Sequence, residues 1–218
     1  MQRDPISQLT GLDELSAFLS ATGRGGRIAD RAEFSWLDQG PFAADRRLAV
    51  VESSPIDLVS VRIQGVVGPR QLLASGAFSL RVGGLPVAGN MVLPTQTHLL
   101  LRRPGVHSGL QASLVQQRQG FFSRTRVGLG WRGRDLAVAL QADAELASAL
   151  MQHLDVDDDL VVNPDPARQL VRIILKRSTQ LRWGLFADPG KLGSFHRRDL
   201  AGDLFACLER IAEHVRAA

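Results

Sequence analysis

Apolar and polar residues alternate along two segments of this chain, and an alternation with period two is typical of a β-strand with one buried face. Residues 59–63 show the pattern first, and residues 72–82 repeat it. Gly83-Gly84 then separates the second segment from another apolar run, residues 85–88. A two-residue hairpin turn needs positive φ at both central positions, which glycine adopts without steric cost. These features predict an antiparallel β-sheet.

Helical spacing of leucines occurs near both ends of the chain and once between them. Residues 7–22 place leucines three and four positions apart, and residues 200–216 form a longer amphipathic stripe. Between them, Asp143 is a predicted helix N-cap, leucines follow at 146, 150 and 154, and the helix is expected to end near His153. The predicted fold class is α+β: mainly antiparallel sheet or sheets with an N-terminal helix, one central helix and a C-terminal amphipathic helix.

Three further segments are predicted to form strands and turns. Residues 136–140 are expected to form a short strand. Residues 171–175 and 181–185 both alternate, so they are expected to face each other in a second hairpin across the polar residues 176–180. The uncharged residues 82–101 have the length of a membrane span, but they contain two prolines and three glycines, which favours strands and turns.

These changes of pattern divide the chain into three segments. Residues 1–47 are predicted to form the N-terminal helix and an arm that wraps the surface of the domain with Trp36 and Phe42. Residues 48–135 are predicted to form an arginine-rich, acid-free β region, and residues 136–218 a mixed α+β region. The pattern fits either separate units or one continuous domain.

Residues 58–134 contain no aspartate or glutamate, although 22 of the 218 residues are acidic and an even spread would place about eight there. The same 77 residues contain ten arginines, whereas residues 1–57 and 135–218 each carry a net charge of −3. The overall net charge of +4 therefore conceals a basic middle region between two acidic flanks. We expect this middle region to contact a negatively charged group.

Within the acid-free region, residues 124–134 alternate in a way that groups their arginines. If the segment is one continuous strand, its β-branched and apolar residues share one face, and its arginines and two glycines share the other. The predicted anion-binding residues are Arg124, Arg126, Arg132 and Arg134, and Arg102 and Arg103 join them if the fold brings them near. Guanidinium groups bind phosphates and carboxylates through paired hydrogen bonds, and a glycine gap lets a ligand approach the backbone.

The arginine stripe predicts a non-catalytic binding module that engages an anionic partner. Nucleic acid and an acidic protein are both candidate partners, and a membrane surface ranks lower because the chain has only two lysines and no basic amphipathic helix. The alternative is a structural or assembly protein in which opposite charges meet, either within the chain at residues 155–159 or between copies in a homo-oligomer. Simple solvation of a strand face would explain each arginine, but it would not explain the missing acidic residues.

Catalytic, cofactor and metal signatures are weak in this sequence, so no catalytic residue, cofactor or metal ligand is predicted. Residues 189–192 resemble a nucleotide-binding loop only in a Gly-Lys pair, and no Gly-x-Ser-x-Gly motif occurs. The acidic residues 155–159 lack the glycine and glutamate of a calcium-binding loop. A small hydrolytic enzyme ranks third, and it would need a cleft that joins His107 or His196 to a buried carboxylate.

The single cysteine, Cys207, has no partner for an intramolecular disulfide, and the first residues lack the apolar segment of a signal peptide. These features predict a cytoplasmic protein. Arginine provides 24 of the 26 basic residues, which is in keeping with a GC-rich bacterial genome.

Overall fold

The computed structural model describes residues 12–37, 47–63, 78–82, 85–119, 125–156, 158–184 and 203–218. The strands in these residues are β1 (Gly26–Asp30), β2 (Arg47–Val51), β3 (Leu58–Ile63), β4 (Phe78–Val82), β5 (Leu85–Arg102), β6 (Ala112–Gln119), β7 (Thr125–Gly133), β8 (Asp159–Asp165) and β9 (Leu170–Gly184). The α-helices are α2 (Leu12–Ala21), α4 (Asp135–Ala142), α5 (Ala144–His153) and α7 (Asp203–Ala217). The short 3-10 helices are η1 (Arg31–Glu33), η2 (Ser35–Leu37), η3 (Ser108–Leu110) and η4 (Pro166–Arg168).

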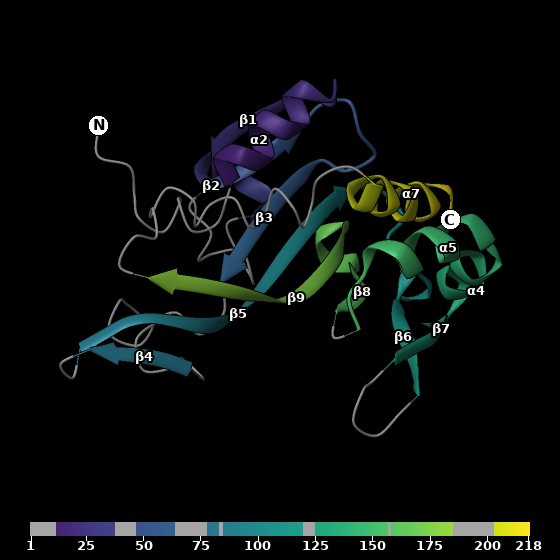
Figure 1. Cartoon of the computed structure of the whole chain (residues 1–218). Coiled ribbons are helices and arrows are strands. Elements are labelled where there is room, and N and C mark those ends of the chain that lie inside the picture. Colours follow the sequence, from purple (N-terminus) through teal and green to yellow (C-terminus); the bar gives the residue numbers. More distant parts are fainter. Residues whose placement is uncertain are drawn as a thin grey trace.

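The described strands form one antiparallel sheet, in which eight follow the order β1-β2-β3-β5-β9-β8-β6-β7 and β4 pairs with β5 (Figure 1). The predicted α+β class with a mainly antiparallel sheet is therefore confirmed. The first predicted hairpin is also confirmed, because β4 and β5 pair with Val82 opposite Leu85. The two glycines between them, Gly83 and Gly84, lie outside the described residues.

The centre of the sheet is a long ribbon in which β5 and β9 pair over fifteen consecutive positions. The uncharged residues 85–101 form one uninterrupted strand, so the turns predicted there do not occur. Pro94 lies where one neighbouring strand gives way to another, because the pairing with β3 ends at Thr95 and the pairing with β4 begins at Asn90. A residue without a backbone N–H is tolerated where a strand lacks a neighbour.

The second predicted hairpin is wrong, because residues 176–180 continue β9 instead of turning. They lie opposite residues 92–96 of β5, so this polar stretch of β9 is held in an extended conformation by its partner strand. Residues 176–180 contain no glycine, proline, asparagine or aspartate, which are the residues that favour tight turns. Their polarity suggested a loop, but the partner strand determined the structure.

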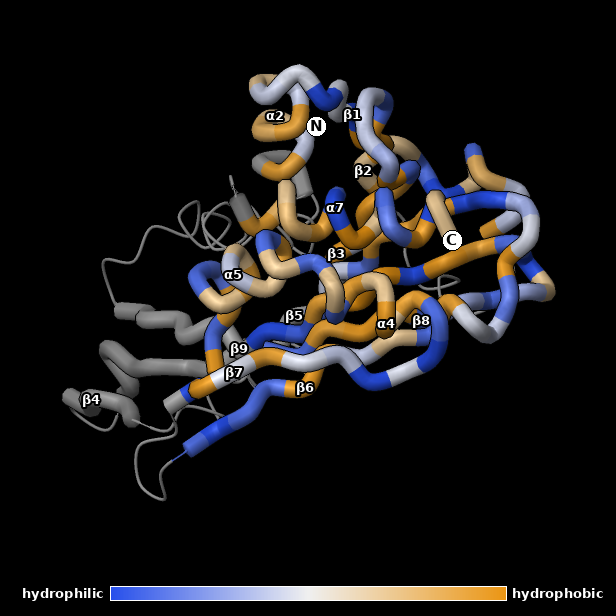
Figure 2. The backbone as a smooth tube through the Cα atoms, turned by 90° about the vertical axis from the view of Figure 1, so that its right-hand side faces the viewer, coloured by the Kyte–Doolittle hydropathy of each residue, from blue (hydrophilic) through white to orange (hydrophobic). Residues whose placement is uncertain are grey.

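The four described α-helices cover one face of the sheet and enclose the main hydrophobic core (Figures 1 and 2). None of them is long and apolar enough to span a membrane. The predicted C-terminal stripe is confirmed from residue 204 onward, because Leu204, Leu208, Ile211 and Val215 are buried in α7, and its first member, Leu200, lies outside the described residues. In α5, the Asp143 carboxylate accepts a hydrogen bond from the N–H of Leu146 at 2.9 Å, and the helix ends at His153 as predicted.

Residues 136–140 belong to helix α4, so the predicted short strand is wrong and the centre of the chain contains two helices. Leu136, Ala137 and Leu140 are buried, whereas Val138 is 72% exposed. A strand would place Val138 on the same face as the two leucines, but a helix turns it away from them. The segment is also rich in alanine and leucine, which are strong helix formers.

A smaller core lies on the opposite face of the sheet, where no described α-helix packs. Its buried members are Leu37, Leu48, Leu58, Leu100 and Leu170, and Phe34, Trp36 and Val50 pack against them. Consequently β3 is buried on both faces from Leu58 to Val61, not on one face as the alternation predicted. The remainder of the predicted arm, including Phe42, lies outside the described residues.

Side chains accept hydrogen bonds from backbone N–H groups of the two terminal strands of the eight-strand path, β1 and β7. The side-chain oxygen of Gln141 accepts a hydrogen bond from the N–H of Trp131 in β7 at 2.8 Å. The Glu33 carboxylate does the same for the N–H of Asp30 in β1 at 3.0 Å. Unpaired backbone groups at a sheet edge are a template for strand addition, so these contacts reduce edge-to-edge association.

Helix α7 connects the two halves of the described chain. Its Glu209 accepts hydrogen bonds from Arg24 at 2.7 Å and from Ser54 at 2.8 Å. Its Arg210 donates to Asp143, the N-cap of α5, at 2.6 Å. Because α7 binds groups before β1, after β2 and before α5, it fixes the positions of these segments on the sheet.

Candidate functional site

The predicted arginine strand is present as β7, but a β-bulge changes the face on which one of its arginines lies. The pairing of β6 with β7 shifts between Gln117 and Arg118, and Val127 is the extra residue. One extra residue reverses the alternation of side chains beyond it. Arg126 therefore points to the helix-covered face, and not to the face of Arg132 as the alternation predicted.

Arg126 binds the C-terminus of α5. Its guanidinium donates hydrogen bonds to the carbonyl of Leu154 at 2.7 Å and to the carbonyl of Met151. The last carbonyls of a helix have no partner within the helix and carry partial negative charge, so a cation there is stabilising. These contacts engage two nitrogens of the Arg126 side chain within the fold.

A second arginine, Arg177 of β9, reaches the same helix end. It donates to the carbonyl of His153 at 3.0 Å and to the carboxylate of Asp158 at 2.9 Å. The Arg177 and Asp158 side chains are 10% and 2% exposed, so they form a buried ion pair. Burial raises the pKa of Asp158 to about 6, although the charge of Arg177 acts in the opposite direction. Arg126 and Arg177 together form a cluster that holds the C-terminal end of α5 and the following Asp158 against the sheet.

Arg103 also binds a helix C-terminus. Its guanidinium donates to the carbonyl of Val215 in the last turn of α7, and to its neighbour Pro104 at 3.2 Å. Two of the six predicted anion-binding arginines, Arg103 and Arg126, therefore contact helix-terminal carbonyls.

Arg132 and Arg134 remain exposed at the other end of β7. Neither has a carboxylate partner among the described residues, and Arg134 donates to the hydroxyl of Ser108 at 3.0 Å. Arg132 lies opposite Ser113 of β6, on the face away from the helices. We call Arg132 and Arg134 the exposed arginine pair. Arg124, the remaining residue of the predicted stripe, lies outside the described residues.

The backbone between the two exposed arginines is unusual. Gly133 has a φ of +156°, and a β-carbon at this position would lie 2.2 Å from the carbonyl oxygen of Gln111. Only glycine fits such a close approach, and it lets the chain pass directly from β7 into α4. Gly133 thereby fixes the direction in which Arg132 and Arg134 leave the backbone.

The two glycines earlier in the strand do not leave the bare gap that the sequence predicted. The amide oxygen of Gln117 lies 2.9 Å from the position of a β-carbon at Gly128. The corresponding oxygen of Gln141 lies 3.5 Å from that position at Gly130. Figure 2 shows the polar end of β6 as a blue segment beyond the helices. A ligand at this strand would therefore meet glutamine amides as well as arginines.

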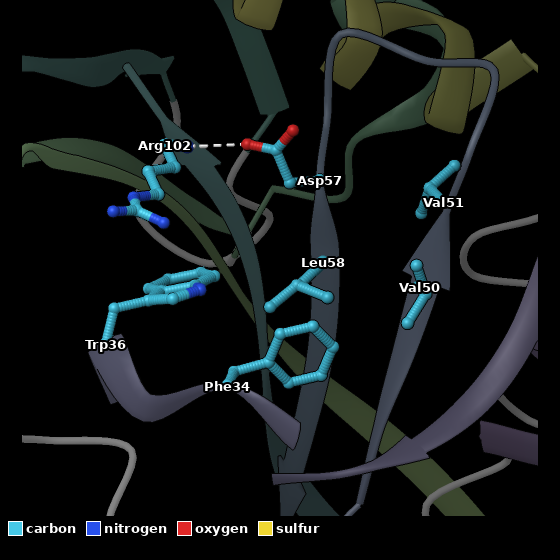
Figure 3. Close-up of a pocket in the computed structure, with 7 residues that line it drawn as sticks. All are labelled: Phe34, Trp36, Val50, Val51, Asp57, Leu58 and Arg102. Carbon is cyan, nitrogen blue, oxygen red and sulfur yellow. Dashed lines mark hydrogen bonds between the residues drawn. The ribbon is translucent and has the colours of Figure 1, made fainter. Parts of the chain in front are cut away.

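Arg102 lies at the rim of a pocket of about 400 Å³ (Figure 3). The pocket is on the face of the sheet that carries the smaller core. This pocket, which we call the Trp36 pocket, is lined by Phe34, Trp36, Val50, Val51, Asp57, Leu58 and Arg102. The guanidinium carbon of Arg102 lies 5.6 Å from the centre of the Trp36 ring, which is a cation–π contact. Phe34 meets Trp36 edge to face, with ring centres 6.0 Å apart.

The carboxylate of this pocket, Asp57, is occupied by other groups. It accepts hydrogen bonds from the backbone N–H of Arg102 at 2.6 Å and from the guanidinium of Arg216 at 3.0 Å. Arg216 belongs to the last turn of α7, so the C-terminal helix contributes to the rim. The side chain of Arg102 is exposed and has no carboxylate partner among the described residues.

The structure does not bring the six predicted arginines into one site. A row of paired residues crosses the sheet through His98, Ile174, Val161, Ser113 and Arg132. Arg102 follows His98 by four positions in β5, so it shares a face with Arg132. Three strands lie between β5 and β7, which separates the two arginines by about 19 Å across the sheet.

The acidic segment after α5 meets basic residues of β9 within the chain. Lys176 pairs with Asp159 at 2.9 Å, beside the buried Arg177–Asp158 pair. Asp155, by contrast, has a side chain that is 84% exposed and lies 3.5 Å from Arg177. The basic partners belong to β9 and lie outside the acid-free residues 58–134, so this pairing is not the one considered for the basic region.

The histidine considered for catalysis, His107, is exposed and caps η3 by accepting a hydrogen bond from the N–H of Gly109 at 3.1 Å. His107 does not contact Asp143 or Asp158, whose described partners are other residues. His196 lies outside the described residues. In the part of the chain that the structure describes, no three His, Cys, Asp or Glu side chains are grouped so that they could hold a metal ion.

Comparison with known proteins gives no match to this chain: no family model, no curated protein and no solved structure. The geometry of the exposed arginine pair and of the Trp36 pocket is therefore the basis for assigning a function.

Proposed function

We propose that the chain is a non-catalytic, cytoplasmic binding module that holds an acidic protein partner at the exposed arginine pair. The observation that carries this proposal is that Arg132 and Arg134 are exposed and have no carboxylate partner among the described residues, in a region without acidic residues. Guanidinium groups bind carboxylates through two parallel, charge-assisted hydrogen bonds. A partner with neighbouring Asp or Glu side chains supplies the matching groups.

The contrast with other arginines supports this proposal. Arg27, Arg168, Arg177 and Arg210 each form an ion pair with an Asp or Glu of the same chain. The chain thus provides carboxylates for arginines that it holds in place. The exposed arginine pair lies in the segment where the sequence provides none.

An acidic protein suits this surface better than nucleic acid does. Proteins that bind single strands usually combine cationic groups with aromatic rings on which bases stack. Trp131 is adjacent to the exposed arginine pair in sequence, but its ring packs against the main core. Phe121 and Phe122 lie outside the described residues, so they support neither partner.

The test compares the binding of a labelled oligoglutamate peptide with that of single-stranded and duplex oligonucleotides over a salt series. The double variant Arg132→Ser/Arg134→Ser is expected to bind the peptide at least about tenfold more weakly at low salt, because it loses charge-assisted hydrogen bonds. The matched control, Arg27→Ser/Arg168→Ser, removes the same charge from arginines that are already paired. It should keep the affinity within about twofold.

Each outcome of this experiment has a separate meaning. Equal losses in the two double variants would show a dependence on net charge alone and would refute the assignment to Arg132 and Arg134. Binding of oligonucleotides in preference to the peptide, with a salt slope that falls by about two in the first variant, would identify nucleic acid as the partner. No binding to any probe at low salt would refute the proposal.

A further inference from the structure

The Trp36 pocket is separate from the exposed arginine pair, and the function proposed above does not use it. We propose that this pocket binds a small amphipathic carboxylate. The apolar body of the ligand lies against Phe34, Trp36 and Val50, and its carboxylate binds the guanidinium of Arg102.

The walls of the pocket suit an apolar body. Phe34, Trp36 and Val50 are only partly buried, whereas Leu58 at the base is 1% exposed. Figure 3 shows Trp36 on one side of Phe34 and Leu58, and Val50 on the other side of them. A ligand in this pocket removes apolar surface of three side chains from water, which is the main source of affinity in such sites. The space of about 400 Å³ is open to solvent on one side, so it suits a small ligand whose charged group stays at the rim.

Arg102 supplies the charge that selects a carboxylate. Its guanidinium lies over the Trp36 ring, and this contact holds the group at the rim before a ligand arrives. A group that is already positioned loses less conformational freedom on binding, which favours affinity. Neutral apolar molecules would fit the walls, but they would leave the strongest polar group of the pocket unused.

Asp57 restricts the charge of the ligand. Its carboxylate is already bonded to the N–H of Arg102 and to Arg216, so the two arginines and Asp57 leave one net positive charge at the rim. A carboxylate with a single negative charge balances this rim. A phosphate monoester carries nearly twice that charge and would be repelled by Asp57 at short range.

The experiment uses 4-phenylbutanoate and its uncharged amide as probes, with binding to the full chain measured by isothermal titration calorimetry. The acid is expected to bind at least about tenfold more tightly than the amide, because only the acid forms a charge-assisted bond to Arg102. In Arg102→Gln this preference should fall to within about twofold. Val50→Phe adds bulk at a partly exposed position and should weaken the binding of both probes.

Two results would overturn this proposal: equal affinity of the unaltered protein for the acid and the amide, or an acid preference that survives in Arg102→Gln. The first result needs no variant, so it is informative even if a substitution prevents folding. Arg132→Ser/Arg134→Ser should bind 4-phenylbutanoate as the unaltered protein does. If it binds the acid more weakly, the acid is held at the exposed arginine pair and the pocket is not its site.

Discussion

Strand β7 carries described arginines at both ends, and their surroundings differ. At one end, Arg126 lies on the helix-covered face and donates hydrogen bonds to the carbonyls of Met151 and Leu154 at the C-terminal end of α5. At the other end, Arg132 points to the face on which no described α-helix packs, and it is exposed. The two residues are six positions apart, so regular alternation would place them on one face. The bulge at Val127 produces the difference.

This comparison shows that the number of arginines in a segment does not give the size of an anion-binding surface. Helix ends and buried carboxylates take up arginines in the fold, as Arg103, Arg126 and Arg177 show. The candidates for a partner are those that the fold leaves exposed. For the described part of the acid-free region, these include Arg102, Arg132 and Arg134.

The largest predicted effect concerns the buried end of this comparison. Arg177→Met removes the buried partner of Asp158 and a donor to the carbonyl of His153. Without Arg177 the buried Asp158 carboxyl must either stay charged without a partner or take up a proton, and the His153 carbonyl loses a donor. We therefore expect the free energy of unfolding to fall by about 4 kcal/mol. Urea denaturation at pH 7 measures this change.

The control for this prediction is the double variant Arg177→Met/Asp158→Asn. Because the two residues are in direct contact, the double variant should be more stable than the sum of the single effects by about 2 kcal/mol. Strict additivity would show that Arg177 and Asp158 contribute independently, and the ion-pair explanation would then be wrong.

Much of the fold was predictable from local pattern, and the failures have a common cause. The hairpin at residues 79–88 and the stripe of α7 were correct because a turn or an amphipathic face is encoded over a few neighbouring residues. The continuity of β9 was missed because residues 176–180 are polar and become a strand only through pairing with β5. Residues 136–140 were assigned to a strand because a short, continuous apolar run fits a buried strand and a buried helix segment equally well.

The candidate site was less predictable than the fold. The acid-free region drew attention to Arg102, Arg132 and Arg134, but nothing local reveals the bulge that turns Arg126 to the other face. The Trp36 pocket joins Phe34 and Trp36, beside and in η2, with residues of three strands, so its lining is defined by strand order. In sequence, Trp36 was the only sign of it, as an aromatic residue in a polar segment.

The second predicted effect compares the two ends of β7 directly. Arg126→Met leaves two carbonyls at the end of α5 without their donor and should lower the free energy of unfolding by about 2 kcal/mol. Arg132→Met changes an exposed side chain and should alter it by less than about 0.5 kcal/mol. Both variants lose one positive charge, so each is the charge control for the other. Similar destabilisation by both would show that Arg132 has a structural role and would weaken its assignment to a partner.

The last predicted effects concern the two carboxylates that flank α5, Asp143 and Asp158, whose pKa values move in opposite directions. Burial raises the pKa of Asp158 to about 6, above its value of about 4 in the unfolded chain. Its contribution to stability is therefore fully present below about pH 4 and is lost as the pH rises through 6. Burial opposes ionisation of Asp143 as well, but hydrogen bonds from His214, the N–H of Leu146 and Arg210 lower its pKa to about 2. That contribution is present above about pH 4 and is lost as the pH falls toward 2.

Unfolding free energies of the unaltered protein, measured relative to Asp158→Asn and to Asp143→Asn, separate these two carboxylates. Relative to Asp158→Asn, the unaltered protein should lose about 2 kcal/mol between pH 4 and pH 7. Relative to Asp143→Asn, it should gain about 1 kcal/mol between pH 3 and pH 5. A change of the same sign in both series would show that the two carboxylates experience the same electrostatic environment. In that case the pKa shifts of Asp158, at the C-terminal end of α5, and of Asp143, at its N-terminal end, would not be opposite in the way that their contacts indicate.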